Sequence, residues 1–251
     1  MSAHYVCNIC GAANTLGEDP RQICAGCRAT VRMRLVMHAF TRGVLGEDQP
    51  LHRLSGKRPL VGIGLSDWTG YAELLAKLCD YTNTYYHQAP QVDICDPPAA
   101  QLRRNDFLIS SDVFEHVPPP PLRAFQGAAS VLKPGGKFLL SVPMNRRSTQ
   151  TIEHFPRLHD FTVAKTGDGY VVVNTLADGG VETYLRPRFH GGPGQTLEMR
   201  IFSETHVREL LAKAGFVDFV AFDADVPEYG LVGLHAVSGV FVATKPAGTG
   251  T

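Results

Sequence analysis

The hydrophobic positions of this chain alternate between short continuous runs and helical stripes. Six runs of apolar, aromatic or β-branched residues have the length and character of strands, at 59–63, 80–86, 107–110, 138–142, 217–222 and 239–243. Between strands, apolar residues recur every three or four positions, as in Tyr71, Leu74, Leu75 and Leu78. Strands that alternate with helices predict an α/β fold with a mostly parallel sheet.

The stretch 105–143 shows this arrangement most clearly. An apolar run at 107–110 is followed by a helical stripe over 122–132 and by a second apolar run at 138–142. The Pro-Gly-Gly run at 134–136 is expected to end the helix. The stretch is therefore predicted to form one β-α-β unit.

A long insertion, about residues 145–202, separates this unit from the next predicted helix, which Ser203 is expected to cap. Within it, the sequence GYVVVNTLADGGVETYL predicts a β-hairpin with its turn at Asp178-Gly179. The insertion also carries His154 and His190.

Four of the six cysteines form two pairs, Cys7-x2-Cys10 and Cys24-x2-Cys27. Each pair places two thiolates on a tight turn, and together the pairs can close a tetrahedral zinc site. A disulfide pair, a redox-active CxxC or a rubredoxin-like iron site are the alternatives. Because four protein ligands leave no open position, we expect the metal to be structural.

Residues 1–42 are expected to form this zinc ribbon and an amphipathic helix. Four apolar side chains should form the buried stripe of the helix, Met33, Val36, Met37 and Phe40. The neighbouring arginines lie largely off this stripe, at Arg28, Arg32 and Arg34. Residues 1–60 contain eight Lys+Arg and four Asp+Glu. A basic ribbon could hold a phosphate-bearing partner, but a solvent-exposed helix face is the simpler interpretation.

Composition limits the other function classes. Lys+Arg and Asp+Glu both number 24, so no overall charge attracts nucleic acid or an acidic membrane. Hydrophobic residues make up 44% of the chain, which is enough for a proper core. We expect neither a membrane span nor a signal peptide, and therefore a cytoplasmic protein.

The string DVFEHV, followed by a helix and by VLKPGGKFLLSVP, resembles the stretch from the fourth to the fifth strand of class I S-adenosylmethionine (SAM)-dependent methyltransferases. GIGLSDW, YTNTYYH, IEHF, FHGGPG and LEMRIFS are similar to a bacterial group of these enzymes that carry a zinc ribbon, several of them associated with glycan or secondary-metabolite pathways. The resemblance implies a Rossmann-like, mostly parallel sheet of seven strands over residues 59–246, with the β-hairpin insertion after strand 5.

The resemblance also implies a SAM site, although the glycine loop departs from the family pattern. Gly62 stands where an acid is usual, and Gly64, Ser66 and Trp68 stand where three glycines are usual. Ser66 or Asp67 could contact the cofactor or cap the next helix. The cofactor-binding residues are expected to be Gly62, Gly64, Ser66, Asn83, Thr84, Asp93, Ile94, Ser111 and Asp112. A purely structural loop is the alternative, and a helix cap or loop salt bridge is the alternative for Asp93.

The chemistry expected is methyl transfer from the SAM sulfonium to an oxygen or nitrogen of a small-molecule, sugar or secondary-metabolite acceptor. His116, just beyond the fourth strand, is the first candidate for the base, with Asp112 holding its other ring nitrogen. His190 and His154 come next, and a packing role is the alternative for each. An RNA methyltransferase that grips RNA with its ribbon, or a binding protein with a lapsed SAM site, are the other functions considered.

Overall fold

Six strands form the central sheet of the computed structural model, in the order β14-β15-β6-β5-β3-β4. The structure describes residues 4–19, 21–167, 169–190, 192–194, 196–234 and 238–248. The strand bounds are β3 Val61–Leu65, β4 Asp80–Thr84, β5 Asn105–Ser111, β6 Leu132–Val142, β14 Val217–Ala221 and β15 Gly239–Thr244. The strands β4, β3, β5 and β6 are parallel, whereas β15 and β14 are antiparallel to their neighbours. The mostly parallel α/β sheet is therefore confirmed.

Over the described residues the sheet has one strand fewer than the expected seven. The segment between β4 and β5 carries Pro90, Pro97 and Pro98, which lack the N–H that a strand inside a sheet must donate. Gln91 forms a single parallel bridge with Tyr85 just beyond β4, and Val92 and Ile94 are then buried in the core, so the pairing does not extend into a strand. The segment thus covers the sheet edge as a loop.

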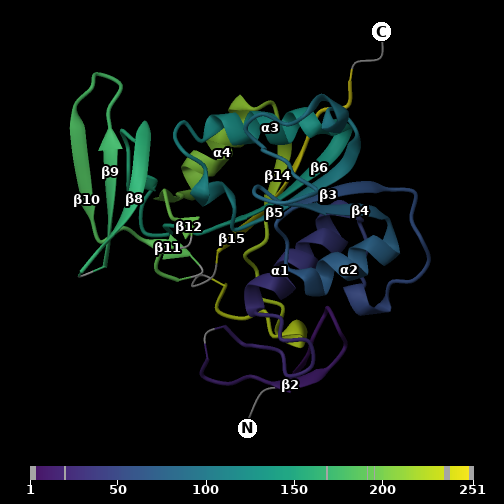
Figure 1. Ribbon diagram of the computed structural model, residues 1–251. Coiled ribbons are helices and arrows are strands. Elements are labelled where there is room, and N and C mark those ends of the chain that lie inside the picture. The colour runs from purple at the N-terminus through teal and green to yellow at the C-terminus, as the bar shows by residue number, and fades with distance from the viewer. Residues whose placement is uncertain are drawn as a thin grey trace.

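Helices cover both faces of the sheet (Figure 1). α1 (Val31–Ala39) and α2 (Thr69–Leu78) lie on one face, and α3 (Leu122–Val131) and α4 (Glu204–Lys213) lie on the other. As expected, Ser203 caps α4, accepting a hydrogen bond from the N–H of His206. None of the helices described is long and apolar enough to cross a membrane. The short helices are η1 Phe40–Val44, η2 Leu51–Arg53, η3 Ala99–Gln101, η4 Phe114–His116 and η5 Pro227–Tyr229.

Residues 107–110 read as one apolar run because the two faces of the sheet bury alternate side chains of β5. Phe107 and Ile109 pack in the core under α1 and α2, and Leu108 packs under α3 and α4. α3 ends at Val131, and Gly135 takes a φ of +80° in the irregular start of β6. The helix therefore ends before the Pro-Gly-Gly run that was expected to end it, and the run lies within β6.

The insertion forms small antiparallel sheets beside the main one (Figure 1). The predicted hairpin is present as β9 (Gly169–Thr175) and β10 (Val181–Leu185), and β8 (Asp160–Thr166) extends it to three strands. Four two-residue strands form two further pairs, β7 Ile152–Glu153 with β13 Arg200–Ile201, and β11 Phe189–His190 with β12 Thr196–Leu197. The β11-β12 pair lies between the hairpin and the main sheet (Figure 1).

The N-terminal segment packs on the main sheet through α1. Its strands β1 (His4–Val6) and β2 (Ala13–Thr15) are antiparallel, and α1 shares one core with α2, β5 and β15. Arg34 of α1 is fully buried, although the stripe of α1 predicts an exposed position. Its guanidinium donates to the carbonyl oxygens of Gln22, Ala29, Tyr229 and Gly230. The solvent-exposed interpretation is therefore wrong for Arg34, because its N–H groups are the hydrogen-bond donors of buried carbonyl oxygens.

We predict that Arg34→Met lowers the free energy of unfolding by about 1–3 kcal/mol, because the substitution leaves buried carbonyl oxygens without a donor. Urea unfolding measures the loss. Arg28→Met is the matched control, since Arg28 is exposed. Equal stability of the two variants would contradict a structural role for the buried guanidinium.

Candidate functional site

The glycines of the predicted cofactor loop face protein side chains. A Cβ atom at Gly62 would lie 2.1 Å from a ring carbon of Phe107, and one at Gly64 would lie 1.9 Å from the hydroxyl oxygen of Tyr81. These two rings stack with their centroids 5.9 Å apart. The missing Cβ atoms therefore make room for aromatic packing, and a larger residue at Gly64 would disturb the core first.

The end of β4 fixes the shape of the loop after β3. Ser66 has a φ of +55°, the left-handed conformation that favours glycine, and its N–H donates to the carbonyl of Thr84. The Asn83 amide accepts from the N–H of Asp67 at 2.9 Å and donates to the Asp67 carbonyl at 2.8 Å. Thr84 is buried and donates to the carbonyl of Gly64. Asn83 and Thr84 thus hold the loop and leave Ser66 exposed.

The side chain of Asp67 turns into the core. Its carboxylate accepts hydrogen bonds from the hydroxyls of Tyr71, at 2.6 Å, and Tyr81. Burial nevertheless raises the pKa of Asp67 to about 7. The expectation that Ser66 or Asp67 caps the following helix is wrong, because α2 begins after Trp68 without a side-chain cap.

Asp93 lies in a tight turn between β4 and β5. Its Oδ1 accepts from the N–H of Cys95 at 2.8 Å. Ile94 is buried, and its carbonyl oxygen passes so close to α3 that a Cβ at Gly127 would lie 1.6 Å from it. The turn therefore holds Asp93 half-buried at the rim of the sheet.

The carboxyl end of β5 is bound to α1. Arg32 makes an ion pair with Asp112, Nε to Oδ2 3.0 Å, and donates to the Ser111 hydroxyl. Asp112 also accepts from the Ser141 hydroxyl at 2.9 Å. The sequence places Arg32 off the buried stripe, where a solvated side chain is expected. The sequence gives no sign of the contact between Arg32 and Ser111, because the two residues lie 79 positions apart.

The three candidate histidines come together. His116 Nε2 lies 3.0 Å from His190 Nδ1. His190 Nε2 and His154 Nε2 lie 2.6 and 3.0 Å from the two oxygens of Glu198. The buried Glu115 completes the group, with its Oε1 3.4 Å from His190 Nδ1. We call these five residues the histidine cluster.

Asp112 does not hold the ring of His116, contrary to expectation. His116 ends the short helix η4, and its Nδ1 donates to the carbonyl of Leu197 at 2.8 Å. Asp112 instead binds Arg32 and Ser141. The insertion therefore supplies the partner that fixes the His116 tautomer.

Burial and the two carboxylates give His116 and His190, the two facing histidines of the cluster, different charges. Burial lowers the pKa of His116, and Glu115 and Glu198 raise that of His190 to about 10. Contacts with His154 and His190 lower the pKa of Glu198 to about 2, whereas burial raises that of Glu115 to about 7. The cluster thus pairs a neutral imidazole with a charged one. The sequence analysis missed Glu115 and Glu198, although Glu115 directly precedes His116.

Arg200 fixes the insertion against β5. Its side chain is fully buried, and Nη1 donates to the carbonyls of Phe114 and Val117 on either side of the Glu115-His116 pair. Its Nε donates to Glu153 at 2.8 Å. These contacts hold the two halves of the histidine cluster together.

A pocket of about 500 Å³ opens between residues 144–149 and the start of α4. Arg146, Arg147 and Arg208 are among the residues that line it, and none of its lining residues belongs to the histidine cluster. The cluster and this pocket are therefore separate features of the same edge of the molecule.

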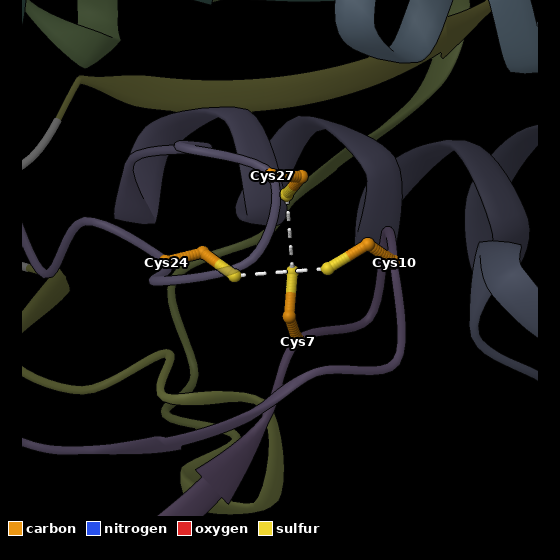
Figure 2. A group of neighbouring side chains, drawn as sticks. All are labelled: Cys7, Cys10, Cys24 and Cys27. Carbon is orange, nitrogen blue, oxygen red and sulfur yellow. Dashed lines mark hydrogen bonds between the residues drawn. The ribbon is translucent and has the colours of Figure 1, made fainter.

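The four N-terminal cysteines form a candidate metal centre (Figure 2). Their sulfur atoms point toward one centre, with Cys7 and Cys27 3.8 Å apart and Cys10 and Cys24 3.7 Å apart. Zinc–sulfur bonds of about 2.3 Å in a tetrahedron require sulfur–sulfur distances of about 3.8 Å. The geometry therefore suits a tetrahedral metal ion.

The two cysteine turns have the same backbone design. The N–H of Gly11 donates to the Cys7 carbonyl, and the N–H of Arg28 donates to the Cys24 carbonyl, at 2.8 and 3.0 Å. Gly11 has a φ of +78° and Arg28 one of +69°. In the second turn the left-handed position is thus Arg28, while Gly26 leaves room for the side chain of Ala12.

The parallel strands β4-β3-β5-β6, extended by the antiparallel β15 and β14 and covered by helices on both faces, define the Rossmann-like methyltransferase class. A family model described as "Methyltransferase domain" matches residues 49–219. The chain therefore belongs to this family and is a SAM-dependent methyltransferase. Among curated proteins, no sequence matches it.

Solved structures show similar folds at low identity. The Burkholderia thailandensis 1,6-didemethyltoxoflavin-N1-methyltransferase is 15% identical, with a TM-score of 0.46, and the match covers 86% of this chain and 78% of that one. The CurJ carbon methyltransferase is 13% identical, with a TM-score of 0.46 and coverages of 86% and 63%. The [4+2]-cyclase SpnF is 14% identical, with a TM-score of 0.45 and coverages of 76% and 77%.

We predict that Asp67 makes stability depend on pH. Its folded pKa of about 7 lies above the unfolded value, so the folded state holds a proton that the unfolded state has lost. The free energy of unfolding should therefore fall by about 2 kcal/mol between pH 5.5 and 7.5, relative to Asp67→Asn. Urea unfolding at several pH values measures this, with the exposed Asp96→Asn as control. Parallel pH profiles for wild type and Asp67→Asn would contradict the prediction.

Proposed function

We propose that this enzyme transfers the methyl group of SAM to an oxygen or nitrogen of a small-molecule, sugar or secondary-metabolite acceptor at the histidine cluster. The observation that carries the proposal is the meeting of His116, His190 and His154 beside the carboxyl end of β5. In open α/β sheets ligands bind at this end of the strands. An acceptor hydroxyl or amine must lose a proton, and the neutral His116 can take it or orient the acceptor.

The SAM site is proposed along the same edge of the sheet. Ser66, Asp93, Ser111 and Asp112 lie at or beyond the ends of β3, β4 and β5, where the cofactor would make contact. Supporting roles are given to the buried residues of the set, Gly62, Gly64, Thr84 and Ile94, and to the half-buried Asn83. Asn83 fixes the shape of the altered loop, because its side-chain amide makes hydrogen bonds with both the N–H and the carbonyl of Asp67.

The geometry favours a small acceptor over RNA. The ribbon carries the excess of basic residues, but Arg34 is buried and Arg32 is paired with Asp112. Fewer cations are therefore free to bind phosphates than the sequence alone indicates. Calorimetry with SAM, followed by transfer assays against hydroxylated small molecules and against RNA at two salt concentrations, tests the proposal.

We predict that His116→Gln lowers the rate of methyl transfer about a hundred- to ten-thousand-fold, the usual effect of losing a positioned base. The affinity for SAM should change little, because the ring contacts the insertion and not the loop after β3. Single-turnover rates and calorimetry measure the two effects. His159→Gln is the control, since His159 is exposed. Transfer within a few-fold of wild type would make His116 a packing residue.

We also propose that Cys7, Cys10, Cys24 and Cys27 bind one structural zinc ion. The tetrahedral arrangement of the sulfur atoms supports this, as does the burial of Cys7 and Cys24. Because thiolates persist in reducing surroundings, a zinc ribbon also agrees with action in the cytoplasm. Residues 1–42, as ribbon and helix, would then brace the sheet that carries the methyltransferase domain at 59–246.

Cys24→Ser is predicted to lower the zinc content by about one ion per chain and to destabilise residues 4–30, because metal binding supplies the folding energy of such a segment. Elemental analysis and hydrogen exchange measure the two effects. Cys79→Ser is the control, since Cys79 does not belong to the group of four cysteines and its thiol donates to the carbonyl of Leu75 in α2. A disulfide between Cys7 and Cys24 in metal-free native protein would overturn the assignment.

A further inference from the structure

The carboxylate of Glu115 is fully buried, yet neither of its oxygens accepts a hydrogen bond from any part of the chain that the structure describes. A buried carboxylate without donors is costly, so such a group calls for a positive partner. Arg200 donates through Nε to Glu153 and through Nη1 to two backbone carbonyls, and its buried Nη2 makes no hydrogen bond with Glu115 or with any other group that the structure describes. The group that faces Glu115 is the charged ring of His190, whose Nδ1 lies 3.4 Å from Oε1, and a bound cation could replace the extra proton of that ring.

The two histidines next to Glu115 are oriented as metal ligands. His116 Nδ1 lies 2.8 Å from a carbonyl oxygen, so this nitrogen carries the hydrogen and Nε2 has the lone pair. His190 Nε2 lies 2.6 Å from Glu198, so when the charged ring gives up one proton, Nε2 keeps its hydrogen and Nδ1 has the lone pair. These two inner nitrogens face each other at 3.0 Å. They can share one proton or bind one cation, and a carboxylate or carbonyl behind each ring is the arrangement typical of metal-binding histidines.

The three inner atoms also have the spacing of a coordination shell. His116 Nε2 lies 3.6 Å from Glu115 Oε1, His190 Nδ1 lies 3.4 Å from the same oxygen, and the two nitrogens are 3.0 Å apart. Metal–ligand bonds of about 2.0–2.1 Å at tetrahedral angles require edges of about 3.3–3.4 Å. The three distances thus describe one face of a tetrahedron around a common centre.

From these observations we propose that Glu115, His116 and His190 bind a divalent transition-metal ion such as Zn²⁺, at a second site separate from the four cysteines. Two neutral imidazoles and one carboxylate form a donor set that suits such ions. Glu198 holds His190 and is itself held by His154, and Arg200 anchors the backbone on both sides of Glu115. The surrounding groups thus fix the ligands before an ion arrives.

Three protein ligands leave at least one position of the ion open, as in catalytic metal sites. The side chain of His190 is 35% exposed, so the open position can be reached from solvent. The ion would bind an acceptor with a hydroxyl or enol oxygen and favour its deprotonated form. This role rests on the proposed function, whereas binding of the ion does not. In this arrangement His116 holds the ion and orients the acceptor through it.

Titration of the full-length protein with Co²⁺ tests the site, because the two centres differ in their ligands. Cobalt bound by four thiolates gives intense sulfur-to-metal charge-transfer bands in the near ultraviolet and visible bands at the red end of the spectrum, whereas cobalt bound by nitrogen and oxygen gives no sulfur charge transfer and only weak visible bands at shorter wavelength. We expect two equivalents, one of each kind. His190→Ala and Glu115→Gln should abolish the weak bands and keep the charge-transfer bands. The control His159→Ala, in the same insertion, should keep both.

Acetohydroxamate, a small oxygen-donor ligand, tests the open position, since its binding should shift the weak visible bands and leave the charge-transfer bands unchanged. Uptake of only one equivalent, weak bands that persist in both variants, or an absence of any shift with acetohydroxamate would overturn the proposal. These readouts need neither SAM nor an acceptor. Failure of methyl transfer would therefore be distinguished from failure of the metal site.

Discussion

The buried guanidinium of Arg200 is the contact on which the candidate active site depends. It joins the insertion to the end of β5 by donating to the carbonyls of Phe114 and Val117, while Glu153 balances its charge. Water cannot replace these bonds, because the side chain is fully buried. The insertion is therefore held at one position over the sheet, and that position brings His190 and Glu198 to Glu115 and His116.

The same edge of the sheet receives a second contact from the opposite direction. Arg32 reaches from α1 to Ser111 and Asp112, so the N-terminal segment touches the residue pair that directly follows the fourth parallel strand. Two added parts of the chain, the N-terminal segment with α1 and the insertion, thus both contact the carboxyl end of β5. Open α/β sheets place their ligands there, and added segments can shape a site that the basic fold leaves open.

In the altered glycine loop, other residues provide the backbone shape that glycines provide in the usual loop. The usual loop uses glycines for its tight turn, whereas here Ser66 adopts the left-handed conformation and Asn83 holds the next residue by two hydrogen bonds. Gly62 and Gly64 remain small because Phe107 and Tyr81 fill the space beside them. A loop that departs from the family pattern can thus keep a defined shape, since the strand beside it supplies the missing constraint.

The sequence by itself determined the six strands of the main sheet, the four main helices, the β9-β10 hairpin and the spacing of the four cysteines, because apolar periodicity, turn residues and caps are local signals. It also singled out three histidines. Only the tertiary structure decided that these histidines meet, that Glu115 and Glu198 join them, and that Arg34 and Arg200 are buried. Partners up to 196 residues apart make these contacts, and no local pattern encodes which distant backbone or carboxylate will satisfy a buried charge.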